Sequence, residues 1–181
     1  KLNLNVRTAS QVLYEVGAFR AADPKELYEQ LAKIEWEKVI PFDGYFTVTS
    51  TVHNEHILTP LFANAKVKDA IVDRIKEVKG VRPDSGPDLH KTAVHLHWME
   101  DRAEIFLDTS GETLAKHGYR KHPGKAPMLE ALATSTIMAT KWDGKSPFIN
   151  PMCGSGTLAI EAALIAQKRM PGLQRMNYAF M

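Results

Sequence analysis

Cysteine is almost missing from this chain: Cys153 is the only one among its 181 residues. An internal disulfide is therefore excluded, and with it the disulfide-stapled class of small secreted domains. Long apolar runs that could span a membrane are also missing, as is a signal-peptide pattern at Lys1. These absences favour a cytoplasmic protein without a membrane partner.

A large excess of one charge is missing as well. The 23 Lys and Arg residues against 21 Asp and Glu give a net charge of +2. This balance permits nucleic-acid binding but does not require it. Charge is uneven along the chain, however, because residues 116–125 read KHGYRKHPGK without an acid, and no acidic residue follows Glu161.

The first 111 residues mix strand and helix patterns. Residues 2–6 alternate as a half-buried strand does. Because the chain starts in this alternation without a methionine, we expect part of the N-terminal module to be missing. Asp23 and Pro24 are typical of a helix start, Glu26 completes a capping-box pattern, and the helix should end before Pro41.

A second helix and three further strands complete this region. Residues 45–49 are rich in aromatic and β-branched residues, which favours a strand. A helix should begin at Thr59-Pro60 and end at Gly80, with Val67, Ile71, Ile75 and Val78 as its buried stripe. Residues 92–98 and 103–107 form a predicted hairpin, in which Val94, Leu96 and Trp98 share the buried face.

The rest of the chain has a different organisation. Residues 112–125 are polar, basic and interrupted by glycine and proline, which indicates a linker. A helix should run over 127–140 with Leu129, Leu132, Ala133 and Ile137 directed inward. A turn at Asp143-Gly144, a short strand over 147–149, a glycine loop and a helix towards Met170 complete the pattern.

The glycine loop carries the chemistry. A strand that feeds a tight turn and then a helix directs unpaired main-chain N–H groups at a ligand. Gly154 and Gly156 allow close approach because a Cβ there would occupy ligand space. Ser155 and Thr157 add hydroxyls near the helix start, which suit a polar cofactor tail.

Three interpretations of this loop remain open from the residues alone. Gly154, Gly156 and Ala159 also match a relaxed dinucleotide fingerprint, although no acidic residue follows about 20 positions later. A phosphate-binding P-loop, sought earlier in the chain at Gly118 to Gly124-Lys125, fits less well. One residue too many separates its glycines, and Ala126 stands where a Ser or Thr should bind Mg²⁺. The third interpretation is a helix cap that binds no ligand.

Five motifs, in order, resemble one family. The loop Asn150-Pro-Met-Cys-Gly-Ser-Gly-Thr157, followed by Ile160-Glu-Ala-Ala163, is similar to the first S-adenosylmethionine (SAM) motif of the THUMP-containing RNA methyltransferases. Residues 68–73, 107–111, 117–120 and 126–130 match other motifs of that family. The likeness is strongest to the bacterial type that methylates N2 of guanine in 23S ribosomal RNA.

This resemblance implies a set of cofactor-binding residues. SAM is the implied cofactor, and the residues that should line its methionine end are Asn150, Pro151, Cys153, Gly154, Ser155, Gly156 and Thr157. The family usually has Asp where this chain has Asn150, so a charge that could orient the cofactor's ammonium is missing. Residues 126–130 should pack beside the cofactor, and Cys153 should be a small packing residue rather than a nucleophile.

The family's catalytic N-P-P-[YF] or D-P-P-[YF] motif does not occur in this sequence. No catalytic residue is therefore assigned, and we expect this chain alone to be inactive while its full-length parent methylates RNA. The predicted fold class is an α+β THUMP-like RNA-binding module (1–111), a basic linker (112–125) and the first strand and helix of a Rossmann-like methyltransferase domain (126–181).

The RNA partner, ribosomal RNA before tRNA, should contact basic side chains. The candidates are Lys116, Arg120, Lys121 and Lys125, with Lys68 and Arg74 as extensions of the surface. A solvated linker is the alternative for the first four. His95 and His97 share a strand face but have no evident third ligand, so no metal site is predicted. Rival functions are an RNA-binding module without catalysis, a tRNA methyltransferase and a nicotinamide-dependent enzyme. A methyltransferase for DNA adenine or for protein is a further alternative within the same catalytic fold, and the THUMP-like half weighs against it.

Overall fold

The computed structural model describes residues 1–41, 44–54, 59–89, 91–122 and 124–179. They form two compact units. Unit 1 comprises Lys1–Val12 and Thr113–Asn177, and unit 2 comprises Leu13–Glu112 with Tyr178–Met181. No helix in the described part of the chain is long and apolar enough to cross a membrane.

Unit 2 is built on a five-stranded sheet with the order β1-β5-β4-β2-β3. β1 pairs antiparallel with β5 and β5 antiparallel with β4, whereas β2 runs parallel to both β4 and β3. The strands are β1 (Leu13–Arg20), β2 (Tyr45–His53), β3 (Asp84–Ser85), β4 (Thr92–Met99) and β5 (Arg102–Asp108). The predicted hairpin of β4 and β5 is confirmed.

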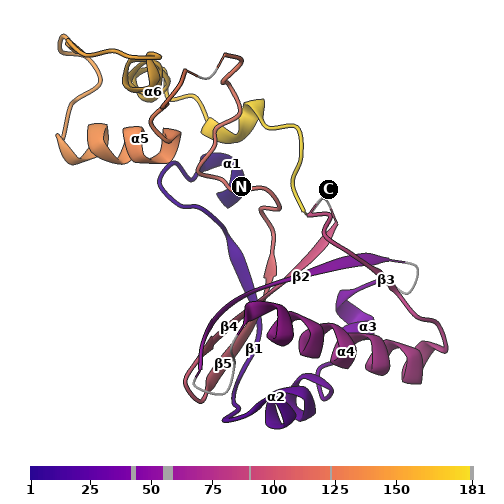
Figure 1. Cartoon of the computed structure of the whole chain (residues 1–181). Coiled ribbons are helices and arrows are strands. Elements are labelled where there is room, and N and C mark those ends of the chain that lie inside the picture. Colours follow the sequence, from indigo (N-terminus) through magenta and orange to yellow (C-terminus); the bar gives the residue numbers. More distant parts are fainter. Residues whose placement is uncertain (42–43, 55–58, 90, 123, 180–181) are drawn as a thin grey trace. The chain divides into compact units, whose positions relative to one another are not determined.

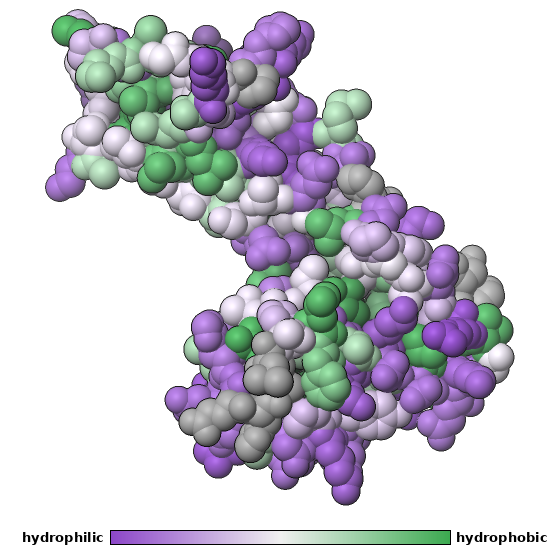
Figure 2. Space-filling model, viewed as in Figure 1, coloured by the Kyte–Doolittle hydropathy of each residue, from purple (hydrophilic) through white to green (hydrophobic). Residues whose placement is uncertain are grey.

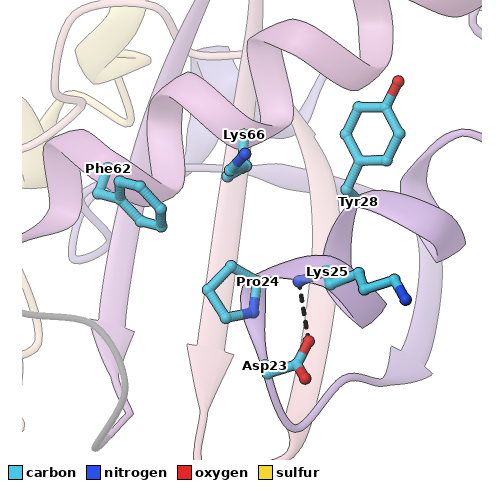
Figure 3. Close-up of a pocket in the computed structure, with 6 residues that line it drawn as sticks. All are labelled: Asp23, Pro24, Lys25, Tyr28, Phe62 and Lys66. Carbon is cyan, nitrogen blue, oxygen red and sulfur yellow. Dashed lines mark hydrogen bonds between the residues drawn. The ribbon is translucent and has the colours of Figure 1, made fainter.

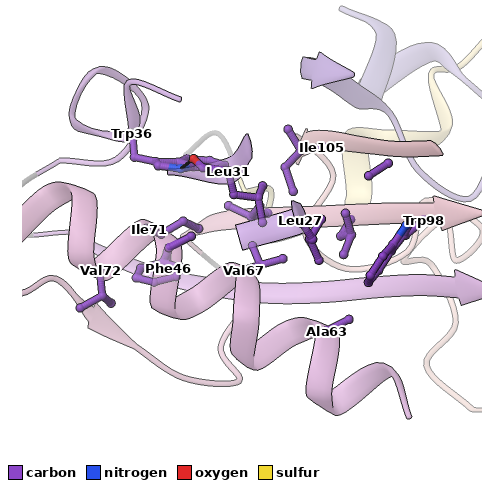
Figure 4. Packing of buried hydrophobic residues seen from close by; sticks show 14 of the residues in the cluster. Leu27, Leu31, Trp36, Phe46, Ala63, Val67, Ile71, Val72, Trp98 and Ile105 are labelled. Carbon is purple, nitrogen blue, oxygen red and sulfur yellow. Dashed lines mark hydrogen bonds between the residues drawn. The ribbon is translucent and has the colours of Figure 1, made fainter. Parts of the chain in front are cut away.

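Three helices of unit 2 pack together beside this sheet: α2 (Pro24–Leu31), α3 (Trp36–Val39) and α4 (Pro60–Lys79) (Figure 1). Their apolar side chains meet those of the strands in one core, where Leu27, Val67, Trp98 and Ile105 are fully buried (Figure 4). At about 25 cal/mol per Å² of apolar surface removed from water, this burial is the main stabilising term of the unit.

The helix starts and stops in unit 2 follow the sequence signals. Asp23 Oδ1 accepts hydrogen bonds from the amides of Lys25 and Glu26, both at 2.8 Å, and Glu26 Oε2 accepts from the Ala22 amide at 2.8 Å. α4 ends at Gly80, whose φ of +71° suits glycine. Two details differ: α2 already ends at Leu31 before a separate α3, and Val78 is exposed.

Unit 1 contains α1 (Leu2–Asn5), α5 (Glu130–Ala139), α6 (Thr157–Ala166) and the 3₁₀ helix η1 (Pro171–Gln174). The prediction of a strand over residues 2–6 is therefore wrong. α1 packs against η1 and buries Asn3, while Leu2 stays exposed. Five alternating residues do not distinguish a strand from a short helix when the partner is a helix rather than a sheet edge.

The packing of α5 differs in part from the prediction. Ala133 and Ile137 are buried, and α5 packs against α6. Leu129 and Leu132 point away from that contact, and Leu132 is 56% exposed. Figure 2 shows the resulting hydrophobic surface over α5.

The segment before the glycine turn is not a strand in this structure. Residues 147–150 have no regular secondary structure, so the predicted strand over 147–149 is not observed. Pro147 has no N–H to donate to a sheet ladder. The segment is fixed instead by the rings of Phe148 and Trp142, whose centroids lie 5.2 Å apart. The predicted turn is present before it, with Asp143 Oδ1 accepting from the amides of Lys145 and Ser146, both at 2.9 Å.

Candidate functional site

The glycine turn leads directly into α6. Gly154 and Gly156 have φ values of +53° and +80°, a conformation that side chains with a Cβ rarely adopt. The Gly156 amide donates to the Cys153 carbonyl at 2.7 Å, which closes the turn. A Cβ built on Gly154 would meet no atom of the described protein within 4 Å, so this part of the turn is open to a ligand.

The start of α6 is suited to a negatively charged or polar group. Gly156 is its N-cap and provides no side-chain cap, and the first turn contains no acidic residue. The positive end of the helix dipole is therefore not compensated by these residues. Ser155 and Thr157 place their hydroxyl oxygens 3.3 Å apart at this end.

Asn150 lies directly before the glycine turn. Its Nδ2 group is buried and has no hydrogen-bond partner within the described part of the chain. A buried donor without a partner is costly, by about 1–3 kcal/mol, unless a ligand or water accepts from it. A carboxylate is a suitable acceptor, so Asn150 and the α6 start fit an amino-acid tail such as that of SAM. By contrast, Pro151, Cys153 and Ser155 are exposed, and Cys153 is not the packing residue expected.

Arg120 connects the glycine turn to residues 126–130. Its Nη1 donates to Ser155 Oγ at 3.2 Å, and its Nη2 donates to Thr157 Oγ1 at 3.1 Å and to the Met128 carbonyl at 2.9 Å. Its Nε donates to Glu130 Oε1 at 3.1 Å. A planar guanidinium makes several such bonds in fixed directions, so Arg120 sets the position of both segments.

A hollow of about 410 Å³ lies beside this arginine. It is lined by Lys116, Gly118, Arg120, Pro127, Met128, Leu129 and Glu130. Residues 126–130 thus border both a hollow and, through Arg120, the glycine turn. This arrangement supports the prediction that they lie next to a cofactor, which stays a prediction.

A buried polar cluster holds α6 in place behind the turn. Glu161 is 0% exposed and His117 is 1% exposed. His117 Nδ1 lies 2.8 Å from Glu161 Oε1, and Thr134 Oγ1 donates to Glu161 Oε2 at 2.6 Å. His117 Nε2 also lies 3.2 Å from the Arg7 carbonyl. His117 and Thr134, both distant from Glu161 in sequence, therefore contact the same carboxylate.

The protonation of Glu161 follows from these contacts. Burial alone would raise the pKa of this carboxyl, but hydrogen bonds from His117 and Thr134 outweigh burial and hold its pKa below the ordinary value. The pKa of the nearby Tyr119 phenol is raised, mainly by burial and in addition by the negative charge of Glu161. Burial lowers the pKa of Arg7, an effect that the Glu161 charge opposes.

Arg7 is attached to the far end of α6. Its Nη2 donates to the carbonyls of Leu164, at 3.5 Å, and Arg169. A cation is favourable at a helix C-terminus. Sequence reasoning did not predict these contacts of Arg7 and Glu161, because their partners lie far away along the chain. The only signal was that His117 and Glu161 each belong to a motif of the family.

The predicted RNA-contacting residues have different surroundings. Lys116, Lys121 and Lys125 are exposed, whereas Arg120 is engaged as described above. In unit 2, Arg74 donates to both oxygens of Glu37, at 3.2 and 3.0 Å, and this contact raises the pKa of Arg74. Lys68 borders a small hollow beside Asn64. That these six basic residues contact RNA stays a prediction.

The strand histidines have ordinary polar contacts. His95 Nδ1 lies 2.9 Å from Thr49 Oγ1, and burial lowers the pKa of His95 although Asp108 opposes the shift. No group of three potential metal-ligating side chains occurs among the residues that the structure describes.

Two family models match the chain. The THUMP domain matches residues 21–108, and the "RMKL-like, methyltransferase domain" matches residues 117–181. The first match lies within unit 2. The second includes the Arg120 contacts, the glycine turn and the buried cluster.

Known proteins resemble nearly the whole chain. The chain is 34% identical over 182 residues to "Ribosomal RNA large subunit methyltransferase K/L" of Colwellia psychrerythraea, which covers 99% of this chain and 26% of that protein. A "predicted N6-adenine-specific DNA methylase" from Listeria monocytogenes is 36% identical, with a TM-score of 0.84, over 97% of this chain and 46% of its own. The putative methyltransferase SMU.472, "complexed with SAH", is 31% identical, with a TM-score of 0.83, over 98% and 47%.

The chain thus spans about a quarter of that curated relative and just under half of these solved chains. The matches confirm the predicted order of an α+β THUMP-type module and part of a methyltransferase domain. The chain joins a THUMP domain to part of an RMKL-like methyltransferase domain and belongs to the THUMP-domain-containing methyltransferase family.

Proposed function

We propose that this chain is part of an RNA methyltransferase that transfers a methyl group from SAM to N2 of a guanine, in 23S ribosomal RNA. The observation that carries the proposal is the covalent union of a THUMP domain with the glycine turn of a methyltransferase domain. The name of the Colwellia relative favours ribosomal RNA, whereas the name of the Listeria relative favours DNA adenine. The RNA-binding half favours RNA as the polymer. We also propose that the parent protein is cytoplasmic and that the RNA-binding module ends at residue 111 and the linker at residue 125.

The chain's own residues would bind and orient the cofactor. The Asn150 amide and the α6 start would bind the methionine carboxylate, and Gly154 would leave space for the tail. When bound, SAM supplies an activated methyl group on its sulfonium. Arg120 would keep the turn and residues 126–130 at a fixed separation, and positioning of this kind accelerates group transfer. The basic side chains Lys116, Lys121 and Lys125 would contact phosphates.

The test uses the full-length parent with methyl-labelled SAM and four substrates: 23S RNA, 16S RNA, tRNA and duplex DNA. Nuclease digestion and mass spectrometry then identify the methylated base. Gly156→Val should abolish labelling, because its φ of +80° strains a β-branched residue. Gly17→Ala is the matched control, since a Cβ there meets Ile105 at an ordinary 3.8 Å and the site lies in the other unit.

The outcomes separate the candidates. N2-methylguanine in 23S RNA, lost in Gly156→Val and kept in Gly17→Ala, is the expected result. N2-methylguanine in tRNA alone would support the tRNA alternative, and N6-methyladenine in DNA would contradict the proposal. RNA binding without labelling of any substrate would leave a binding module.

A further inference from the structure

A hollow in unit 2, far in sequence from the glycine turn, combines an exposed aromatic ring with two lysines. It has a volume of about 550 Å³ and is lined by Asp23, Pro24, Lys25, Tyr28, Phe62 and Lys66. Figure 3 shows that Phe62 and Lys66 come from α4 and lie above Pro24 of α2, whereas the Tyr28 ring is directed away from Phe62. Of these residues, the sequence indicated only Lys66 as a possible extension of the basic RNA surface.

Phe62 is the first reason to regard this hollow as a binding site. Its side chain lies at the start of α4 and is 46% exposed, and the neighbouring Leu61 is also exposed. A large aromatic ring in this position loses the favourable burial that the core gives to Phe46. Its exposed ring is a surface on which a flat ligand can stack.

The charge around the ring is the second reason. Lys66 Nζ lies over one face of the Phe62 ring, 5.6 Å from its centre, so a base would stack on the opposite face with this cation close by. The first turn of α4 contains no acidic residue, and Thr59 makes no side-chain cap, so the positive end of this 20-residue helix is not compensated there. Asp23 also lines the hollow, but its Oδ1 accepts the two amide bonds that cap α2.

An aromatic face next to lysines matches the chemistry of single-stranded nucleic acid. A base stacks on the ring, and the adjoining phosphate contacts the cations. In a duplex the base faces are already stacked on each other, so a ring of this kind selects unpaired nucleotides. We propose that the hollow formed by Pro24, Tyr28, Phe62 and Lys66 binds one unpaired nucleotide of the RNA, with its base on Phe62 and its phosphate at Lys66. This inference rests on the proposed RNA substrate.

The experiment measures binding of two fluorescent RNAs to the 181-residue chain by anisotropy over a range of salt concentrations. One RNA is a 12-nucleotide single strand without secondary structure, and the other is the matching duplex. The variants are Phe62→Leu, Phe62→Trp and Lys66→Gln. Lys79→Gln is the matched control, because Lys79 is an exposed lysine in the last turn of the same helix. Thermal unfolding midpoints equal to the wild type show that each variant is folded.

We expect Phe62→Leu to weaken binding of the single strand about tenfold, and Phe62→Trp to bind as tightly as the wild type or more tightly. Lys66→Gln should reduce the slope of log affinity against log salt by about 0.7, and Lys79→Gln should leave it unchanged. Duplex binding should be unaffected in the Phe62 variants.

Two results would overturn the inference. Equal single-strand binding by the wild type and Phe62→Leu would exclude the stacking site, and that result would leave the proposed methylation of RNA untouched. If Lys66→Gln and Lys79→Gln weakened binding of the single strand equally, the role of Lys66 would be that of general surface charge and not of a specific site. If instead the parent methylates no RNA and the chain binds neither probe, the proposed function fails together with this site.

Discussion

The interiors of the two units differ in kind. The main core of unit 2 is apolar, and its two buried tryptophans donate their indole N–H groups to main-chain carbonyls: Trp36 to Leu31 at 2.8 Å and Trp98 to Ala21 at 2.9 Å. Unit 2 also buries the carboxylate of Asp108, which accepts from the Ser110 amide at 2.8 Å near the end of β5. The interior of unit 1 is centred on a carboxylate, Glu161, bonded to His117 and Thr134. One unit gains stability mainly from apolar burial, whereas the other depends on exact pairing of polar groups.

This difference has a consequence for the candidate site. A buried charge is unfavourable unless all its partners are in place, so a polar interior tolerates few alternative arrangements. In unit 1, Glu161 fixes α6 to His117, and Arg120 fixes the start of α6 to residues 126–130. The glycine turn is therefore fixed by polar contacts at both ends of its segment.

The largest expected effect is on the apolar interior. Trp98→Ala should lower the free energy of unfolding of unit 2 by about 3–5 kcal/mol, because it leaves a cavity and removes the bond to Ala21. The indole N–H signals of Trp36 and Trp142 in a ¹H–¹⁵N spectrum report on units 2 and 1 during denaturation. Trp98→Phe, which keeps most of the volume, should have a smaller effect. An equal loss for both variants would contradict a role of packing.

The polar interior should respond to acid. The pKa of Glu161 is below its ordinary value of 4.5, so its contribution to stability is fully present above that value and is lost as pH falls through the folded pKa. Glu161→Gln removes the titrating group and should be about 2–4 kcal/mol less stable near pH 7.

The gap between Glu161→Gln and the wild type should narrow as pH falls below about 4.5. This difference in the free energy of unfolding is measured by urea denaturation, monitored through the Trp142 signal. Asp143, whose pKa is lowered to about 2 by amide bonds from Ser146 and Lys145, is present in both proteins and cancels in the comparison. A gap independent of pH would show that the charge of Glu161 is not the origin of its contribution.

A change in ligand binding, without a change in unit 2, is expected at Arg120. Arg120→Lys keeps the charge but cannot make the contacts to Ser155, Thr157, Met128 and Glu130 together. Affinity for SAM or its demethylated product should fall about tenfold in calorimetry on the parent protein, which corresponds to 1.4 kcal/mol. Lys121→Gln is the neighbouring charge control and should leave cofactor affinity unchanged. Unchanged cofactor affinity in Arg120→Lys would contradict the role of Arg120 in positioning the glycine turn.

The smallest expected effect is at a helix cap. Asp23→Ala should destabilise unit 2 by about 1 kcal/mol, because the amides of Lys25 and Glu26 lose their acceptor. Asp23→Asn preserves an oxygen in the same place and should lose only a few tenths of this amount. The Trp36 signal should register the change while that of Trp142 does not. A loss at both signals would mean that the two units do not unfold separately.

Local signals in the sequence were enough for much of unit 2. Asp23, Pro24 and Gly80 act within one helical turn of their own positions, and the alternation of Val94, Leu96 and Trp98 reflects one sheet face. The positive φ of Gly154 and Gly156 agrees with the expected tight turn. The cofactor-binding role of this turn stays a prediction.

Features that depend on distant partners were not predictable in this way. Residues 2–6 and 147–149 looked like strands, but whether a short apolar segment forms a strand depends on a neighbouring edge. The contact of His117 with Glu161 joins residues 44 positions apart, and neither residue type announces its partner. Arg120 lay in a basic run that suggested phosphate contacts, yet its own neighbours Glu130 and Thr157 surround its guanidinium.

The division of the chain also affects its synthesis. Lys1–Val12 belongs to unit 1, but the rest of that unit begins only at Thr113. A ribosome that adds about 5–20 residues per second needs roughly 5–20 s to make the hundred residues of Leu13–Glu112 in between. During this interval Arg7 has been made, but the carbonyls of Leu164 and Arg169 that it binds have not. The THUMP half can therefore fold first, and a fragment begun at Thr113 would lack the Arg7 guanidinium that binds these two carbonyls.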